Sequence, residues 1–438
     1  MIFAGGEKVQ RNFAVAAGLF TLTFVIWGAP AAAQVYANLD PLNVFKAYDR
    51  GRNTSVLQRE RPEYDPVGVP AGSFLLYPQL STSLGYVNNI LATKTNTQSD
   101  GFVEVAPSAR LVSQWTRNSL VATAGADLDR YFSHGSENEN AWYVNAVGRY
   151  DAVGESYLQG GAEARRDYQE RTDVNFPTLA NQPIPVNTYD GFFRGVYQQD
   201  RLRATALGSF QHSDFSSVDK LGGGTLDQSS RNVNAASGIG RLDYAVSPDT
   251  AVFVDASYHN YSYPVQGTFN RDAHLWSASA GANFDLTALV RGEIGIGYTR
   301  QTFANPAFKT IEGLGFHGRV EYFPTQLTTL TLTASRGIDT SVLANTGGFI
   351  ATNASLRVDH ELLRNLLLNA NFDYENDSFH GADRTDHVYT VGGGFQYLVS
   401  HSAVIKAGVN YISRTSSGTQ AGREFNVPRL TVSLVLRR

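Results

Sequence analysis

Apolar and polar side chains alternate along most of the chain with a period of two. In the clearest segment, 363–375, polar residues separate a series of apolar ones: Leu366, Leu368, Ala370, Phe372 and Tyr374. Successive side chains of an extended strand point to opposite faces, so this segment has one apolar and one polar face. The pattern recurs from about Gly72 to the last residue. It predicts many strands, each lying between an apolar and an aqueous environment.

The first residues have the features of a secretion signal. Lys8 and Arg11 precede an apolar run from Phe13 to Trp27, and three alanines end at Ala33. This order predicts a signal peptide over residues 1–33, cleaved after Ala33. The alternative is an uncleaved anchor helix, but a membrane span needs about 20 apolar residues and the run is shorter.

Two-faced strands behind a secretion signal predict an all-β fold, a transmembrane antiparallel up-and-down β-barrel over residues 72–438. The composition fits a barrel with a wet lumen, because 42% hydrophobic residues, 25 Phe, 22 Tyr and 41 Gly accompany a mean hydropathy of −0.23. The alternative is a soluble β-sandwich. A sandwich would not need lines of charge on the second face of so many long strands.

Residues 34–71 have a different character and predict a periplasmic N-terminal segment. Between Asp40 and Asp65, arginines are mixed with acids, Asn and Pro, and no periodic pattern is sustained. We expect a loosely ordered extension with a short helix around 42–48. The alternatives are a segment that plugs the lumen and one that docks a partner.

Short and long connections alternate along residues 72–438. Tight turns are predicted at 116–118, 151–155, 198–201, 247–250, 285–288, 323–326, 360–365 and 399–402, and longer polar loops at 91–100, 134–139, 171–188, 216–230, 264–271, 304–312, 339–348, 379–384 and 416–422. Outer-membrane barrels have short periplasmic turns and long outer loops, so the pattern predicts about 18 strands, with 16 to 18 compatible. No strand edge can stay unpaired in lipid, so the first strand near Phe74 should pair with the last near Leu434.

The charged residues of these strands should face the lumen, because a basic side chain facing lipid at mid-membrane costs about 2–4 kcal/mol. The candidates are Asp127, Asp129, Glu163, Arg165, Arg203, Asp255, Arg291, Glu293, Arg319, Glu321, Asp373, Glu375, Lys406 and Arg429. Both signs are present, which predicts a weak ionic preference. Aromatic residues near strand ends should form lipid-facing girdles: Tyr86, Trp115, Tyr131, Phe132, Tyr150, Tyr244, Tyr258, Tyr322, Phe323 and Tyr397.

Two long loops are candidates for narrowing the lumen. Residues 171–188 form the third outer loop and contain three prolines, and residues 220–231 contain Gly222, Gly223 and Gly224. The first could fold inward as a constriction, and an exposed loop is an equal alternative.

The sequence gives little support for an enzyme, a metal site or a nucleic-acid-binding protein. The chain has no cysteine, and its net charge of −4 includes no basic stripe for nucleic acid. The nine histidines are dispersed without the spacing of a Ser–His–Asp or metal site, so we predict no catalytic, cofactor-binding or metal-binding residues and no cofactor. A barrel enzyme is the weakest alternative.

The start of the barrel resembles a known family. The segments Glu63-Tyr64-Asp65-Pro66-Val67-Gly68, Ala71-Gly72-Ser73-Phe74-Leu75-Leu76-Tyr77-Pro78 and Tyr86-Val87-Asn88-Asn89-Ile90 are similar to the opening of the Putative beta-barrel porin 2 family of proteobacterial outer membranes. Val105-Ala106-Pro107 and Trp115-Thr116-Arg117-Asn118 are similar to its second strand and first turn. The resemblance, from about Arg61 to Arg438, implies an outer-membrane barrel with porin-like passage or a link to exopolysaccharide export. The chain ends in Arg437-Arg438 and not in the aromatic residue that many such barrels carry.

We therefore predict a Gram-negative outer-membrane channel for passive passage of small hydrophilic solutes or saccharides, filtered by bore size and mixed lumen charge. The alternative is an accessory barrel for exopolysaccharide export or surface assembly, occluded by the N-terminal segment. The expected partners are outer-membrane lipid and the barrel-assembly machinery, with polysaccharide-export components under the alternative. The pattern does not fix the oligomeric state or the solute.

Overall fold

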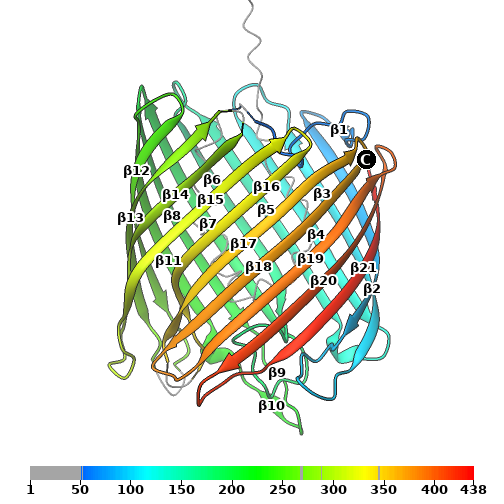
Figure 1. Cartoon of the computed structure of the whole chain (residues 1–438), viewed down its shortest axis with the longest axis vertical. Helices are drawn as coiled ribbons and strands as arrows, with labels where there is room; N and C mark the ends of the chain where they lie inside the picture. The colour runs from blue at the N-terminus through cyan, green and yellow to red at the C-terminus, as the bar shows by residue number, and fades with distance from the viewer. Residues whose placement is uncertain (1–50, 52, 267–269, 288, 344–345) are drawn as a thin grey trace, which may run out of the picture.

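The protein is an eighteen-stranded antiparallel barrel, described by a computed structural model over residues 51, 53–266, 270–287, 289–343 and 346–438 (Figure 1). The barrel strands are β2 (Phe74–Asn88), β3 (Ser99–Ser113), β4 (Ser119–Tyr131), β5 (Glu139–Asp151), β6 (Tyr157–Gln169), β7 (Ile184–Gln199), β8 (Leu202–Phe215), β11 (Val233–Ala245), β12 (Thr250–Ser262), β13 (Ala273–Leu286), β14 (Val290–Phe303), β15 (Ile311–Thr325), β16 (Thr328–Thr340), β17 (Gly348–Leu363), β18 (Leu366–His380), β19 (Thr385–Leu398), β20 (Ala403–Ser417) and β21 (Phe425–Arg437). The predicted fold class and strand number are confirmed.

The first and last barrel strands close the ring. β2 pairs antiparallel with β21, with Thr82 opposite Leu434 and Ser83 opposite Ser433. The two serine hydroxyls share a hydrogen bond of 2.8 Å. Every barrel strand therefore has a neighbour on both sides, which meets the requirement that no backbone edge be left unpaired in lipid.

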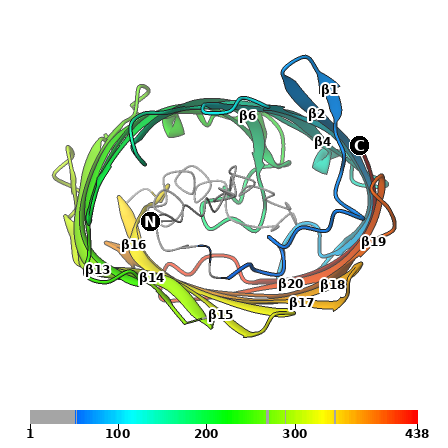
Figure 2. The same cartoon turned by 90° about the horizontal axis from the view of Figure 1, so that it is seen from above.

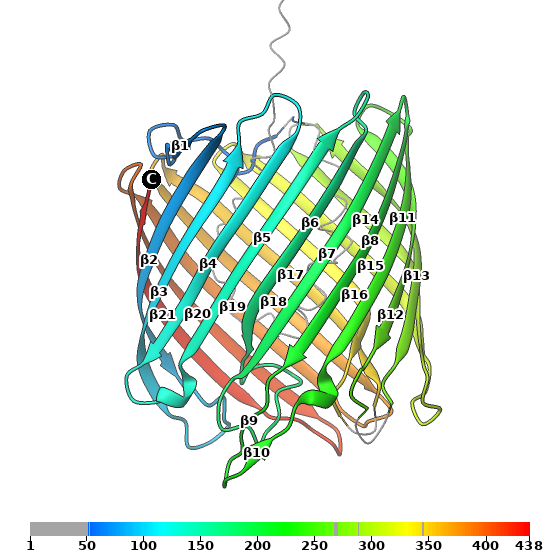
Figure 3. The same ribbon diagram turned by 180° about the vertical axis from the view of Figure 1, so that it is seen from behind.

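Short turns gather at one end of the barrel and long loops at the other (Figures 1 and 3). Only residues 200 and 201 join β7 to β8, whereas residues 216–232 join β8 to β11. The C-terminus lies at the turn end, as does the short strand β1 (Val69–Ala71), which pairs with the start of β2. The small elements at the loop end are β9 (Val218–Asp219), β10 (Thr225–Leu226) and the 3-10 helices η1 (Gly135–Glu137) and η2 (Ser229–Arg231).

The two faces of the barrel wall follow the alternation of the sequence. On β14, Ile294 and Ile296 are 53% and 57% exposed on the outside, whereas Arg291 and Glu293 point inward and are 1% and 2% exposed. Eight of the ten aromatic residues predicted for the lipid-facing girdles are exposed on the outside, but Tyr131 and Phe323 point into the barrel. Tyr131 packs on Phe102 with 5.3 Å between ring centroids, and Phe323 is only 5% exposed. Each is adjacent to an outward aromatic, Phe132 or Tyr322, and neighbouring strand residues cannot share a face.

Residues 53–66 run inside the ring at the turn end and pack against its wall (Figure 2). Val56 is fully buried, and its N–H donates to Thr329 Oγ1 at 3.0 Å. Arg61 forms an ion pair with Glu361 at 2.7 Å. This part is therefore not the loosely ordered extension that we expected, because its arginines and backbone have partners on the wall. The predicted signal peptide and the helix at 42–48 lie outside the described residues. Within the described ranges no helix is long and apolar enough to cross a membrane.

Candidate functional site: the inner wall and the third outer loop

The strand register brings the predicted lumen residues to the inner face of the barrel. Arg291 stands opposite Glu321, Glu293 opposite Arg319, and Glu163 opposite Asp190. The same alternation of faces places the whole predicted set inward: Asp127, Asp129, Glu163, Arg165, Arg203, Asp255, Arg291, Glu293, Arg319, Glu321, Asp373, Glu375, Lys406 and Arg429. Whether they select solutes stays a prediction.

On β11 to β15, near the turn end, inward charges are paired with one another. Arg241 reaches Asp243 and Glu293, each at 2.7 Å, and its guanidinium lies 3.8 Å from the centre of the Phe253 ring. Arg291 pairs with Glu321 at 2.6 Å and also donates to the backbone oxygen of Asn53 at 2.9 Å. These side chains are almost fully buried. Paired in this way, they tie neighbouring strands and the N-terminal segment together.

The N-terminal segment adds further pairs to this end. Glu361 on β17 accepts from both Arg59 (3.2 Å) and Arg61 (2.7 Å). Burial lowers the pKa of Arg61 below its ordinary value, against the opposing effect of Glu361. Arg437 donates to the backbone oxygen of Tyr64 at 2.8 Å. Residues 53–65 thus contact the wall from β14 around to β21.

On β3 to β7 the loop-side half of the wall is rich in acid. The inward carboxylates of this half are Asp100, Glu104, Asp127, Asp129, Glu139, Glu163, Asp167 and Asp190. The inward base among them is Arg165, which reaches Glu163 at 2.9 Å and Asp167 at 3.0 Å. Asp129 is 6% exposed, and its Oδ1 has no hydrogen-bond partner in the described chain. Closer to the turns the same strands present Arg110, Arg149 and Arg194. The two signs are therefore separated along the barrel axis.

The third outer loop, residues 170–183, folds into the barrel and reaches the far wall (Figure 2). It leaves from β6 and returns at β7. Asn175 exchanges hydrogen bonds with the backbone of Thr340 (3.3 Å), the last residue of β16, and of Val342 (3.2 Å), just after it. Six strands separate β7 from β16 around the ring. Val174 packs beside Phe349 and Phe379 of that wall. The structure therefore has this loop folded inward and not exposed outside the barrel.

Arginines hold the third loop in place from several sides. Arg171 reaches Glu137 of η1 at 2.6 Å and donates to the backbone oxygen of Asn181 at 2.9 Å. Arg423, from the loop between β20 and β21, donates to the backbone oxygen of Arg171 at 2.8 Å. Burial lowers the pKa of Arg423 to about 10, so it is still charged at neutral pH. These contacts hold the loop in place, and none of them pairs with a carboxylate of the β3–β7 wall.

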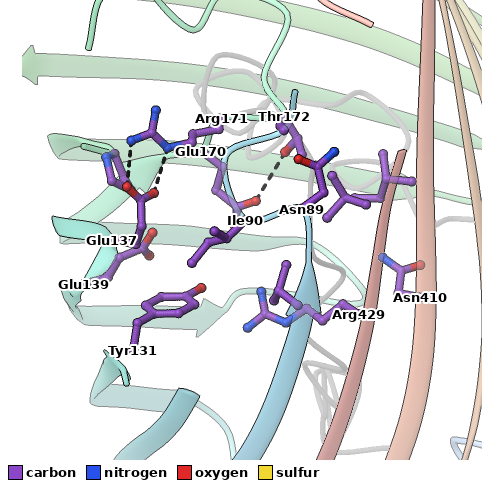
Figure 4. A pocket seen from close by; sticks show the side chains of 15 residues that line it. Asn89, Ile90, Tyr131, Glu137, Glu139, Glu170, Arg171, Thr172, Asn410 and Arg429 are labelled. Carbon is purple, nitrogen blue, oxygen red and sulfur yellow. Dashed lines mark hydrogen bonds and ion pairs between the residues drawn. The ribbon is translucent and has the colours of Figure 1, made fainter. Parts of the chain in front are cut away.

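A small cavity lies between the third loop and the closing strands (Figure 4). Its volume is about 60 Å³, and Tyr131, Glu139, Glu170 and Arg429 are among the side chains that line it. Burial raises the pKa of the Glu170 carboxyl, although Arg429 opposes the shift. Arg429 is itself oriented by the Phe102 ring, 4.2 Å away. Among the charged residues that line the cavity, three are acids and two are bases.

Residues 220–231, the second loop predicted to narrow the lumen, lie differently from the third outer loop. The hairpin β9–β10 projects from the loop end of the barrel (Figure 3), and Gly222, Gly223 and Gly224 are exposed at its tip with φ of +86°, +101° and +86°. Its base covers the third loop, since Leu221 N–H donates to the backbone oxygen of Leu179 at 2.8 Å. The prediction that residues 220–231 narrow the lumen was wrong for the hairpin, because it projects away from the bore.

Sequence reasoning missed several inward charges. Arg241 and Asp243 stand in a regular alternating strand, yet Glu104, Asp190 and Arg241 were not singled out. Their alternation with outward apolar residues was the available signal. The pairing of Arg241 with Glu293 had no signal, because the two residues are far apart in sequence. Among the described residues, no group of three or more His, Cys, Asp or Glu side chains is arranged to hold a metal ion.

Comparison with known proteins identifies the family to which the chain belongs. The sequence matches the family described as "Putative beta-barrel porin 2" over residues 61–438. The chain therefore belongs to this family and is a porin-like barrel of the outer membrane. That agrees with the expectation that it is not an enzyme, which stays a prediction. No curated protein matches the sequence.

Solved structures that match the chain include three proteins of Pseudomonas aeruginosa. OpdO is 14% identical with a TM-score of 0.44, over 83% of this chain and 97% of that one. OpdK is 13% identical with a TM-score of 0.46, over 83% and 99%. The ferric enterobactin receptor PfeA, as a mutant, is 9% identical with a TM-score of 0.44, over 83% and 80%. At this level of similarity no solute can be transferred to this chain.

Proposed function

We propose that this member of the porin family is a passive channel for small hydrophilic solutes or saccharides, narrowed by its third outer loop and favouring cations there. The observation that carries the proposal is the third loop, which spans the bore beside a wall with many more carboxylates than bases. Charged groups of one sign around a narrow passage raise the local concentration of the opposite ion.

The paired charges near the turns of β11 to β17 have little influence on selection in this proposal, because Arg241, Arg291, Arg319 and Arg357 each have an acid within ion-pair distance. The loop end faces the exterior and the turn end the periplasm, in keeping with the usual arrangement of outer-membrane barrels. Residues 1–33 are then the signal peptide, and the segment inside the ring lies on the periplasmic side. The contacts of residues 53–66 run along the wall and do not require that they fill the bore.

Planar-bilayer recording of the purified mature chain tests this function. In a gradient of KCl across the bilayer, the reversal potential should show a preference for K⁺ over Cl⁻. The triple variant Asp127→Asn, Glu163→Gln, Asp190→Asn should lower that preference severalfold with the conductance largely kept. Glu155→Gln, in a periplasmic turn, is the matched control and should leave both unchanged. Absence of conducting steps from folded protein would overturn the channel, and an unchanged reversal potential in the triple variant would overturn the cation preference.

A further inference from the structure

In the part of the chain that the structure describes, charged side chains at outward strand positions are confined to the loop end of the barrel. Among the described residues, the charged residues at outward strand positions are Arg130, Arg166, Asp214, Arg300, Glu312 and Arg336. All six lie in the part of their strand next to the loops. The rest of the outward face is apolar, small, aromatic or uncharged polar. A basic side chain costs about 2–4 kcal/mol at the bilayer midplane and about 0–1 kcal/mol near the interface, so these residues mark one lipid–water boundary.

Arg130 on β4 and Arg166 on β6 form the most cationic part of this boundary. The outward positions around them hold Asn140, Tyr168, Tyr189 and His212, with the 38% exposed Trp142 toward the membrane. Tyr189 and His212 are stacked with 6.4 Å between their ring centroids. Amphipathic rings of this kind favour the headgroup level of a bilayer. We name Arg130, Asn140, Arg166 and Tyr168 the headgroup patch.

Neither arginine of the headgroup patch has a carboxylate within ion-pair distance among the described residues. Arg130 donates to the backbone oxygens of Asp129 (2.7 Å) and Glu139 (2.8 Å) and to Asn140 Oδ1 (2.5 Å). The Arg166 guanidinium lies 5.9 Å from the centre of the Tyr168 ring, and its Nε has no hydrogen-bond partner. Arg300, at the same rim on β14, differs because it pairs with Glu312 at 3.2 Å.

We infer that the headgroup patch binds an anionic lipid of the outer leaflet through a phosphate of its headgroup. A guanidinium presents parallel N–H donors that match phosphate oxygens. Because the patch contains no carboxylate, an anion from outside the protein is needed to neutralise its two positive charges. Arg166 stands opposite Trp142, which stands opposite Ala126, so Arg130 is two strands and four residues away, about 16 Å at the backbone. The Arg130 guanidinium turns to Asn140 and that of Arg166 turns toward Tyr168, so the two can reach one headgroup from two sides. The acyl chains of that lipid would lie on the apolar surface below, beside Trp142. The inference does not depend on conduction.

Native mass spectrometry of the folded barrel, released from vesicles of phosphatidylglycerol and phosphatidylcholine in equal parts, tests the inference. The wild-type protein should retain phosphatidylglycerol in severalfold excess, and Arg130→Gln/Arg166→Gln should lose most of that excess. Arg300→Gln is the matched control, because it removes an outward arginine that already has an internal partner, and it should keep the wild-type ratio.

Equal retention by the double variant and the wild type would overturn the inference. So would loss of the excess in Arg300→Gln, which would show a diffuse effect of net charge. Inorganic phosphate added at concentrations that leave the vesicles intact should not remove the lipid, and removal would assign the patch to free anions. Heat-modified electrophoretic mobility checks that each variant is folded. If the double variant does not fold, each single variant should lose part of the excess, and two single variants that keep all of it overturn the inference.

Discussion

The turn-side and loop-side halves of the inner wall use charge in different ways. Near the turns, Arg241, Arg291 and Glu361 each belong to a buried ion-paired group that links strands or holds the N-terminal segment. On the loop side of β3 to β7, carboxylates outnumber bases, and Asp129 and Asp190 each have a buried oxygen without a hydrogen bond in the described chain. The difference teaches that a charged inward residue of a barrel is structural where it is paired and available to solutes where it is not.

Removal of the third loop should give the largest change. Replacement of residues 172–181 by a short Gly–Ser linker takes away the segment that crosses the bore, so conductance should rise severalfold. The acid-rich wall remains, and with a wider bore the cation preference should fall but not reverse. Single-channel recording in KCl measures both. Replacement of Gly222 and Gly223 by Asn at the hairpin tip is the control and should change neither, since that tip points outward and Leu221, which contacts the third loop, is kept. An unchanged conductance after loop removal would place the narrowest point elsewhere.

Breaking a pair on the turn-side wall should affect stability more than conduction. Arg241→Met leaves Asp243 and Glu293 buried without their base, and removing one partner of a buried pair costs about 3–5 kcal/mol. Urea unfolding in detergent should show a lower midpoint, with the ion preference close to that of the wild type. Arg300→Gln, whose exposed pair with Glu312 contributes about 0–1 kcal/mol, is the stability control. If Arg241→Met instead shifts the reversal potential and leaves the midpoint alone, the division between the two halves is wrong.

A smaller, local effect is expected at the outer loops when the pH falls. Asp383 accepts hydrogen bonds from the backbone N–H and the hydroxyl of Thr419, each at 2.9 Å, and these bonds lower the pKa of its carboxyl. A lowered pKa in the folded state means that the contact stabilises the loop above the ordinary pKa, about 3.9, and is lost as the pH falls below it.

The absence of cysteine allows a single spin label at Gln420→Cys to report this contact. The label should become more mobile as the pH falls through the range below about 4. In an Asp383→Asn background its mobility should be higher at neutral pH and nearly independent of pH. A wild-type label whose mobility ignores acidification would show that this hydrogen-bonded carboxylate does not hold the loop.

Much of the architecture could be predicted because the barrel wall is a local structure repeated many times. Alternation such as that of Leu366 to Tyr374 fixes which residues of a strand share a face, and short polar interruptions fix the turns. The same rule applied more strictly would have kept Tyr131 and Phe323 out of the girdle, because each adjoins another aromatic. The family resemblance was confirmed over residues 61–438.

The site could be predicted only in part. The inward direction of Asp127 or Arg291 follows from alternation, but their partners do not. Arg241 meets Glu293 only because closure brings β11, β12, β13 and β14 side by side in one register. The inward fold of residues 170–183 depends on acceptors and apolar surface near Thr340 and Phe349, more than a hundred residues away.

Local sequence was enough to establish three properties of this barrel: strands with one apolar and one polar face, short turns at one end with long loops at the other, and a polar inner surface. Those properties depend on neighbours one or two residues apart, because a strand's side-chain direction is set by its backbone. Only the tertiary structure decided which charges neutralise one another, that the third loop crosses the bore and the glycine hairpin does not, and that residues 53–66 lie on the inner wall. Ion pairs and loop positions depend on distances across the closed ring, and no local pattern encodes them.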